Sequence, residues 1–320
     1  MKIRIWGARG SLPTSMDAKT LQDKLVAALL AANGKQLDTA DKARDFVLNE
    51  LDFAVSHTFG GNSPCVQIDT GNDEHLLCDL GSGARAFAQH MMRMHGPARQ
   101  QTYHFVMSHM HWDHIMGFPL FAPLYIAGNR VIIYGCHAQL EAAFRRQHAA
   151  PSFPVEFDQL AAKIEFVTLT PGVASEICGV KVSAMLQAHS GDSYCYRFER
   201  AGKTFVYSTD SEHKLEDALE TAKFVEFFRN ADLVVFDSMY SLADSVSVKA
   251  DWGHSSNIIG VELAQMAQAR RLCLFHHEPV FNDQELLNIW RETQRYEAIT
   301  RPGDLPLEIL SAYDGLEIAL

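Results

Sequence analysis

Four side chains that can bind a metal ion occupy six consecutive positions in this sequence, directly after an apolar run at residues 103–107. They are His109, His111, Asp113 and His114. Two imidazoles at positions i and i+2 that leave the end of a strand can converge on one cation, and the Asp-His pair after them can turn toward a second. A lone histidine is more often structural, but four such residues at this spacing favour a metal site. Nitrogen and carboxylate donors suit zinc, iron or manganese.

Composition narrows the class of protein. The chain has 320 residues, of which 47% are hydrophobic, and is long enough to bury a large core. It contains no run of about 18 apolar residues, so we expect no membrane span. The net charge of −11 argues against a broad nucleic-acid-binding face, which needs clustered Lys and Arg, and we therefore expect no nucleic-acid partner. A small anionic substrate is compatible with this charge, because bound cations can reverse the field locally.

The pattern of cysteines indicates the cellular compartment of the protein. All six are scattered, mostly within apolar runs, and none forms a Cys-X-X-Cys pair. Buried free thiols in a reducing cytoplasm are the simplest explanation. Residues 1–6 read as a short strand and lack the apolar core of a signal peptide. We therefore expect a cytoplasmic protein.

Short β-branched or aromatic runs alternate with turn signals along most of the chain, and helical patterns lie between them. This mixture predicts an α+β fold in which packed sheets are covered by helices, rather than a doubly wound parallel sheet. The predicted strands lie at residues 65–70, 76–79, 103–107, 131–134, 164–169, 180–186, 194–199, 204–208, 233–237, 272–275 and 307–310. The predicted helices lie at residues 84–94, 139–147, 215–230, 257–269 and 284–299, with Asp283 as a candidate cap for the last.

Residues 13–58 interrupt this pattern with two helical segments, at 18–32 and 39–51. Leu21, Leu25 and Leu29 share one helical face, which must pack against something. We interpret the segment as a helical insertion in a single domain that spans residues 1–320. A structural role, a lid and a contact in a homodimer all remain open for it.

Further candidate ligands follow predicted strands downstream. His189, Asp210 and His276 each stand directly after an apolar run, where strand ends meet at one edge of a sheet. A carboxylate in the position of Asp210 can bridge two cations. His254 differs from these residues, because it precedes a predicted helix.

The ordered set of ligands resembles the metallo-β-lactamase superfamily. The resemblance implies an αβ/βα sandwich of two mixed sheets flanked by helices, with two metal ions at one edge. One metal ion would be held by His109, His111 and His189, the other by Asp113, His114 and His276, with Asp210 bridging them. Asp79, at the end of another predicted strand, is similar to an aspartate that supports the metal loop without binding metal.

Other residues resemble the phosphodiesterase branch of that superfamily, which includes tRNA 3′-processing endonucleases and phosphoribosyl cyclic phosphate phosphodiesterases. β-Lactamases of the common di-zinc type carry Cys at the position of Asp210 and lack a histidine at position 114. Residues 253–256 are similar to the His-Ser-Thr run of the phosphodiesterases, in which the histidine contacts phosphate and donates a proton. The resemblance gives that role to His254, oriented by Asp237, and we expect both residues and Asp113 to be catalytic.

Two glycine-rich segments, residues 6–11 and 60–63, and the segment 276–279 are also similar to bacterial phosphodiesterases of this branch. Glycine permits backbone to approach a ligand closely, although turn formation explains these glycines equally well. Arg9, Asn62 and Ser255 are the expected substrate contacts. A structural hydrogen-bonding role is the alternative for the first two.

Together these features predict a metal-dependent hydrolase. We expect a phosphodiesterase that acts on a small or cyclic phosphate ester with hydroxide activated by two divalent ions, Zn²⁺ in the first place and Mn²⁺ or Fe as alternatives. An RNA-processing endonuclease of the same branch is the alternative within this chemistry. A lactonase or thioesterase, or a binding protein without catalysis, are alternatives outside it.

Overall fold

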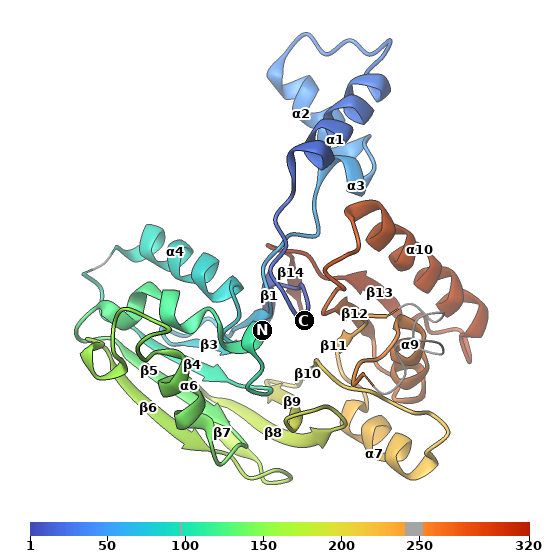
Figure 1. The fold of residues 1–320 in the computed structure, drawn as a ribbon. Coiled ribbons are helices and arrows are strands. Elements are labelled where there is room, and N and C mark those ends of the chain that lie inside the picture. Colours follow the sequence, from blue (N-terminus) through green and yellow to red (C-terminus); the bar gives the residue numbers. More distant parts are fainter. Residues whose placement is uncertain (97, 241–251) are drawn as a thin grey trace.

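The computed structural model describes residues 1–96, 98–240 and 252–320, and its strands form two seven-stranded sheets (Figure 1). In the first sheet, β1, β2 and β3 pair antiparallel, whereas β3 to β6 run parallel. Its strands lie in the order β14 (Glu317–Ala319), β1 (Lys2–Gly7), β2 (Cys65–Asp69), β3 (His75–Cys78), β4 (Thr102–Val106), β5 (Arg130–Gly135) and β6 (Lys163–Thr168).

The second sheet is mixed in the same way. Strands β7 to β10 pair antiparallel, and β10 to β13 run parallel. Its strands lie in the order β13 (Glu308–Ser311), β12 (Arg271–Phe275), β11 (Leu233–Asp237), β10 (Lys203–Ser208), β9 (Ser193–Arg200), β8 (Val180–Gln187) and β7 (Ser175–Ile177).

Three of the four apolar clusters among the described residues hold the layers together. The central one joins the inner faces of the two sheets, for example Ile5 and Val66 from the first and Phe205 from the second. A second cluster packs α4 (Gly83–His95) and α6 (Leu140–Gln147) on the outer face of the first sheet. A third packs α7 (Ala218–Phe228) and α9 (Asn257–Met266) on the second sheet. The result is the αβ/βα sandwich, so the predicted fold class is confirmed.

Three helices between β1 and β2 stand away from the sandwich (Figure 1). They are α1 (Ala18–Ala31), α2 (Ala40–Asn49) and α3 (Phe53–Ser56), and we call residues 18–56 the arm. Every residue of α1 is at least partly exposed. The base of the arm is fixed to α10 (Asp283–Thr300) by the ion pair between Lys24 and Asp283, 2.5 Å apart.

Every strand and helix predicted from the sequence has a counterpart, but details at the ends differ. The three-residue strands β7 and β14 were not predicted, because they are too short to show alternation. Asn282, and not Asp283, caps α10, since its side chain accepts hydrogen bonds from the backbone N–H groups of Gln284 and Glu285. Among the described residues, no helix has both the length and the apolar character needed to cross a bilayer.

Candidate metal centre

Residues that follow strand ends in both sheets meet at one edge of the sandwich. His109 lies just beyond β4, Asp210 beyond β10 and His276 beyond β12. Asp210 and His276 adopt φ angles of 44° and 60°. Positive φ is uncommon for residues other than glycine and is concentrated at functional sites, because the surrounding structure must hold it in place. The backbone therefore turns sharply at the points where these two side chains are presented.

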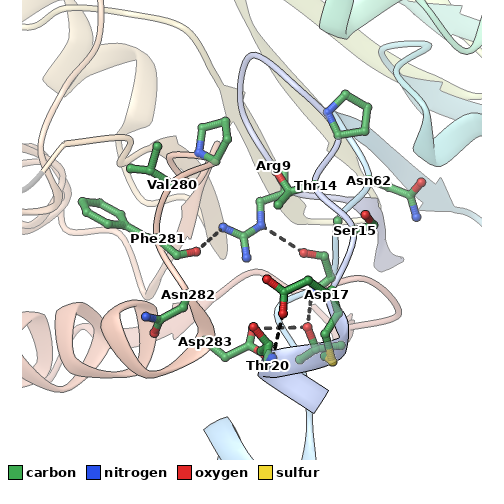
Figure 2. A pocket seen from close by; sticks show the side chains of 16 residues that line it. Arg9, Thr14, Ser15, Asp17, Thr20, Asn62, Val280, Phe281, Asn282 and Asp283 are labelled. Carbon is green, nitrogen blue, oxygen red and sulfur yellow. Dashed lines mark hydrogen bonds between the residues drawn. The ribbon is translucent and has the colours of Figure 1, made fainter. Parts of the chain in front are cut away.

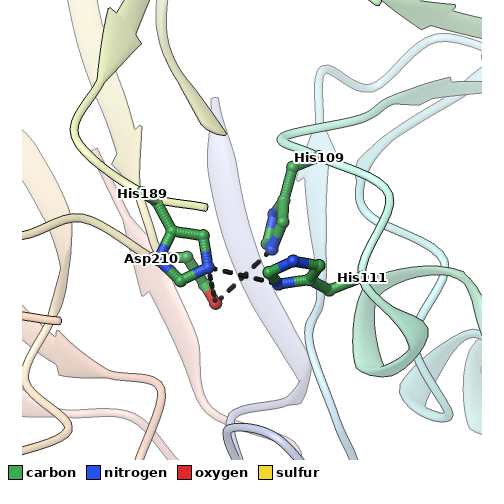
Figure 3. Close-up of side chains that lie close together, drawn as sticks. All are labelled: His109, His111, His189 and Asp210. Atoms are coloured by element: carbon green, nitrogen blue, oxygen red, sulfur yellow. Dashed lines mark hydrogen bonds and ion pairs between the residues drawn. The ribbon is translucent and has the colours of Figure 1, made fainter. Parts of the chain in front are cut away.

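The first ligand cluster contains three imidazoles and one carboxylate. The ligand-type atoms of its members lie within 4.8 Å of one another. Figure 3 shows the four side chains pointing toward a common centre. Oδ2 of Asp210 lies 3.6 Å from Nε2 of His109 and 3.8 Å from Nε2 of His189. The members are His109, His111, His189 and Asp210.

The second cluster shares Asp210 with the first. Its other members are Asp113, His114 and His276, again with ligand-type atoms within 4.8 Å. Oδ1 of Asp210 lies 3.1 Å from Nε2 of His114 and 3.2 Å from Nε2 of His276. Asp210 thus directs one carboxylate oxygen toward each cluster, which is the arrangement that a bridging ligand requires.

The hydrogen bonding of the buried imidazole nitrogens indicates whether these residues fit metal ions. Nε2 of His109 and Nε2 of His114 are buried and form no hydrogen bond of acceptable geometry among the described residues, although carboxylate oxygens of Asp210 and Asp113 lie nearby. An unsatisfied buried polar atom is costly, and a cation would satisfy both. Burial and the neighbouring imidazole of His114 lower the pKa of His109 well below its usual value, so the ring keeps the lone pair that a metal needs. The residues present therefore fit divalent metal ions.

The second cluster has the opposite electrostatic character. Burial lowers the pKa of His114, but the carboxylates of Asp210, Asp113 and Asp79 outweigh it and raise this pKa well above the usual value. The negative charge of these carboxylates, which stabilises a protonated imidazole, would equally stabilise a metal ion bound to the neutral ring. The second cluster is therefore an anionic site that suits a divalent ion.

Neighbouring groups orient the ligand imidazoles. Oδ2 of Asp79 lies 2.8 Å from Nδ1 of His114, and Asp79 also accepts hydrogen bonds from Ser108 and from the hydroxyl of Tyr207. Nδ1 of His189 lies 2.7 Å from the carbonyl oxygen of Gly253. When Nδ1 is the donor in each pair, Nε2 is free to bind a metal. Asp79 occupies the supporting position that the sequence implied.

Two glycines permit close packing against the ligand rings. A Cβ atom at Gly10 would lie 2.6 Å from Cε1 and Nδ1 of His276, and one at Gly253 would lie 2.6 Å from Nδ1 of His189. Contacts this short do not occur with real side chains, so only glycine fits both positions. Next to Gly10, the backbone N–H of Ser11 donates to Oδ2 of Asp113 at 2.9 Å. Sequence reasoning missed Ser11, and its glycine-rich surroundings were the only signal.

The partly buried His254 and the buried Asp237 form a pair beside both clusters. Nδ1 of His254 lies 2.8 Å from Oδ2 of Asp237, and the His254 ring stacks on that of His276 with centroids 5.0 Å apart. Burial lowers the pKa of His254, but Asp237 raises it more strongly, to about 9. The carboxylate is itself fixed by the backbone N–H groups of Ser211 and Met239. Asp237 therefore favours the protonated form of His254 at the edge of the ligand clusters.

The side chains of the three expected substrate contacts, Arg9, Asn62 and Ser255, all hydrogen-bond within the protein, and their contact with substrate stays a prediction. Arg9 donates to the carbonyl oxygens of Gly60 and Glu278. It also donates to the carbonyl oxygen of Phe281, as Figure 2 shows. The amide of Asn62 donates to Asp314 and accepts from the hydroxyl of Ser82. The hydroxyl of Ser255 donates to the carbonyl of Ser211 and accepts from the backbone N–H of His213. The sequence motifs that contain these three residues do not determine where their side chains point.

The chain belongs to the β-lactamase superfamily, because the family model for the β-lactamase superfamily domain matches residues 66–277. Among curated proteins, a ribonuclease Z from Prochlorococcus marinus (strain MIT 9515) is 25% identical over 291 residues, which cover 72% of this chain and 90% of that protein.

Solved structures share the fold. The metallo-β-lactamase fold protein YhfI from Bacillus subtilis has a TM-score of 0.63 and 17% identity, with 99% of this chain and 98% of that chain covered. A diphosphatase from the PhnP family has a TM-score of 0.59 and 19% identity, with 100% and 97% covered. Both likenesses extend over the whole sandwich, including the edge that carries the ligand clusters.

Proposed function

We propose that this protein is a dinuclear metal-dependent phosphodiesterase that acts on a small or cyclic phosphate ester. The observation that carries the proposal is the pair of ligand clusters joined by Asp210, with the charged pair of His254 and Asp237 beside them. A hydrolase of phosphate esters needs both a cationic centre for the anion and a proton donor for the leaving group. The names of the relatives, ribonuclease Z and diphosphatase, support phosphate as the reacting group.

One ion would be held by the first cluster and one by the second, with Asp210 shared. When bound, two divalent ions lower the pKa of coordinated water to near neutrality and offset the charge of a phosphodiester. We propose zinc, because imidazole nitrogen and carboxylate oxygen are common zinc donors, and iron or manganese are the alternatives.

The chain's own groups supply the proton transfer. His254 stays protonated because Asp237 accepts its Nδ1–H, which leaves Nε2–H to donate to a phosphate oxygen or to the departing alkoxide. Asp113 is fixed by the N–H of Ser11 and lies 3.2 Å from Nε2 of His276, so we assign it to the second metal position and to the catalytic set. Asp79 has a positioning role through His114.

RNA processing is the second candidate, and the ribonuclease Z relatives favour it. The similarity to proteins named ribonuclease Z argues against the expectation that this protein has no nucleic-acid partner. The net charge of −11 remains an argument for a small substrate, because grip on RNA relies on Lys and Arg that neutralise phosphates.

Three turnover assays on the same metal-loaded protein separate these activities. We expect hydrolysis of bis-p-nitrophenyl phosphate and of a cyclic phosphodiester, with little hydrolysis of p-nitrophenyl acetate. Faster turnover of the acyl ester would overturn the proposal in favour of a lactonase or thioesterase. Cleavage of tRNA precursors with a higher kcat/KM than any small diester would select the RNA alternative.

The His254→Ala variant assigns the proton donor. It should keep its metal content, measured by elemental analysis, and lose roughly 10²- to 10⁴-fold in kcat toward a cyclic diester, whose alkoxide leaving group needs the proton of a general acid. Unchanged turnover of the cyclic diester would exclude His254 from the mechanism.

We also propose that residues 1–320 form one domain with the arm as an insertion, and that the protein is a cytoplasmic homodimer. All six cysteines are free thiols, which supports a reducing compartment. Leu29 and Leu30 of the arm are 73% and 72% exposed, which supports burial against a second copy.

A further inference from the structure

A cavity of about 890 Å³ lies next to the ligand loop, and the proposed reaction does not account for it. Its wall contains Met110 and Trp112 from the ligand loop and α5 (Trp112–Ile115), Arg146 from α6, Phe153 from the loop after α6, and Tyr194 from β9. We call it the Trp112 cavity. Pockets for small organic ligands have volumes of roughly 300–1,000 Å³, so this one can hold a group larger than phosphate alone.

The cavity adjoins the first ligand cluster directly. Trp112 stands between His111 and Asp113 in the chain. Gly191 is part of the cavity wall, and a Cβ atom placed there would lie 3.4 Å from Nε2 of His111, which is van der Waals distance. A molecule in the cavity would therefore extend to the edge of the centre that we assign to phosphate.

The wall combines a flat aromatic surface with polar groups. The Trp112 side chain is 80% exposed, which is unusual for the largest apolar side chain, and Leu120 at the same cavity is 55% exposed. Exposed apolar side chains that gather around a hollow indicate a binding site. Aromatic rings favour flat partners that can stack on them.

Arg146 supplies a cation to the same wall. Its neighbour Arg145 is paired with Glu141 and Asp158, whereas Arg146 has no ion-pair partner within the described part of the chain. Gln139 also lines the cavity. An acyl chain would use the apolar wall but would leave these polar groups without partners, whereas a heterocyclic base has both a flat face and a polar edge.

We propose that the Trp112 cavity binds the aromatic base of a nucleoside phosphate, whose phosphodiester then lies at the ligand clusters. This inference rests on the proposed phosphodiesterase function and assigns its substrate class. The base stacks on Trp112, and its polar edge faces Arg146 and Gln139. The base can come from a small nucleotide or from the end of an RNA chain, and the cavity volume favours the small nucleotide.

A matched pair of substrates tests the assignment. Adenosine 2′,3′-cyclic phosphate and glycerol 1,2-cyclic phosphate present the same five-membered cyclic diester, and only the first carries a base. We expect the wild-type protein to prefer the adenosine compound by about 10- to 100-fold in kcat/KM, the range that one base stacked on an aromatic side chain provides. Trp112→Ala should bring this preference close to one, and Trp112→Phe, which keeps a flat ring, should restore most of it.

Leu219→Ala is the control variant, because Leu219 is 81% exposed on α7 and is not among the cavity-lining residues. It should keep the preference of the wild type. Equal kcat/KM for the two substrates in the wild-type protein, or a preference that survives in Trp112→Ala, would overturn the inference while the phosphodiesterase function stands.

A binding measurement keeps the two proposals separate. Adenosine 3′-monophosphate should quench tryptophan fluorescence of the metal-loaded protein, glycerol phosphate should not, and Trp112→Phe should abolish the quenching. If neither cyclic diester is hydrolysed but this quenching occurs, the base site stands and the proposed reaction fails. If a tRNA precursor is cleaved with higher kcat/KM than the adenosine compound and Trp112→Ala removes that advantage, the base site also stands and the base belongs to RNA.

Discussion

Oδ2 of Asp237 lies 2.8 Å from Nδ1 of His254, and this contact orients the imidazole and favours its protonated form. Asp237 is fully buried at the end of β11, the central parallel strand between β10 and β12, so its carboxylate has little freedom to move. Through this contact the second sheet presents a protonated ring to the ligand clusters, and the ring stacks on His276. Asp237, which is held in the sheet, therefore positions His254, the proton donor that we propose.

Asp237→Asn should lower turnover because an amide does not stabilise the imidazolium of His254. We expect kcat to fall about 10²-fold for a diester with an alkyl leaving group, which needs a proton. The loss should be much smaller for bis-p-nitrophenyl phosphate, because nitrophenolate departs without one. Steady-state kinetics with both diesters measure the difference, and metal content serves as the control. Equal losses for the two leaving groups would contradict proton donation by this pair.

Metal stoichiometry tests the shared position of Asp210. Because its two oxygens face different clusters, Asp210→Ala should lower the content of both metal ions toward zero from about two per chain. His189→Ala removes a member of the first cluster alone and should leave close to one ion. Elemental analysis of protein purified without chelator gives both values. Retention of two ions in Asp210→Ala would show that this carboxylate does not bridge them.

Gly10→Ala should displace His276, because the added methyl group would lie 2.6 Å from two atoms of its ring. We expect weaker binding at the second metal position and a loss of activity of roughly tenfold or more, since a shift of about 1 Å at a catalytic centre can cost 10²-fold. Gly303→Ala is the matched control, because a Cβ atom there meets nothing within 4 Å. Normal metal content and turnover in Gly10→Ala would indicate that the loop moves without cost.

The arm provides a prediction about assembly. Leu25 and Leu29 are 55% and 73% exposed on α1, and their burial against a second copy would remove apolar surface from water. The double variant Leu25→Lys, Leu29→Lys should therefore sediment as a monomer under conditions in which the wild type is a dimer. Leu219→Lys, at a site on α7 that is 81% exposed, should sediment like the wild type. A wild type that is monomeric at all concentrations would exclude the homodimer.

The meeting of the candidate ligands at one edge could be predicted from sequence because they follow strand ends. Apolar runs locate β4, β10 and β12, and the residues that closely follow each run had to lie at a sheet edge. The supporting contacts could not be predicted in this way. The N–H of Ser11 reaches Asp113 across 102 positions in the chain, and no local pattern encodes such a pairing.

The protein partners of the expected substrate contacts could not be predicted for a related reason. Arg9 lies next to Gly10, which packs against the ring of His276, but the guanidinium of Arg9 turns away to backbone carbonyls at the base of the arm. A sequence motif identifies the segment that approaches a site, whereas the direction of each side chain depends on contacts with distant elements. The Trp112 cavity was missed likewise, because its wall combines residues from α5, α6 and β9.

Asp314 predicts how stability depends on pH. Burial raises the pKa of its carboxyl to about 6, and Oδ1 has no hydrogen-bond partner among the described residues, whereas Oδ2 accepts from Gly61, Asn62 and the Asn62 amide. An acid whose pKa is higher in the folded state binds more protons there than in the unfolded state, in which an Asp titrates near pH 3.9. Its contribution to stability is therefore greatest below about pH 4 and is lost as pH rises through about 6.

Asp314→Asn removes this titration while one side-chain oxygen remains to accept the same three hydrogen bonds. We expect the free energy of unfolding of the wild type to fall relative to that of the variant between pH 4 and pH 7, because only the wild type must bury a charged carboxylate at the higher pH. Urea denaturation of both proteins at several pH values measures the difference, with metal content checked at each pH. Asp304→Asn, at an exposed bend, is the matched control and should show no such divergence. Parallel curves for Asp314→Asn and the wild type would mean that Asp314 titrates normally in the folded protein.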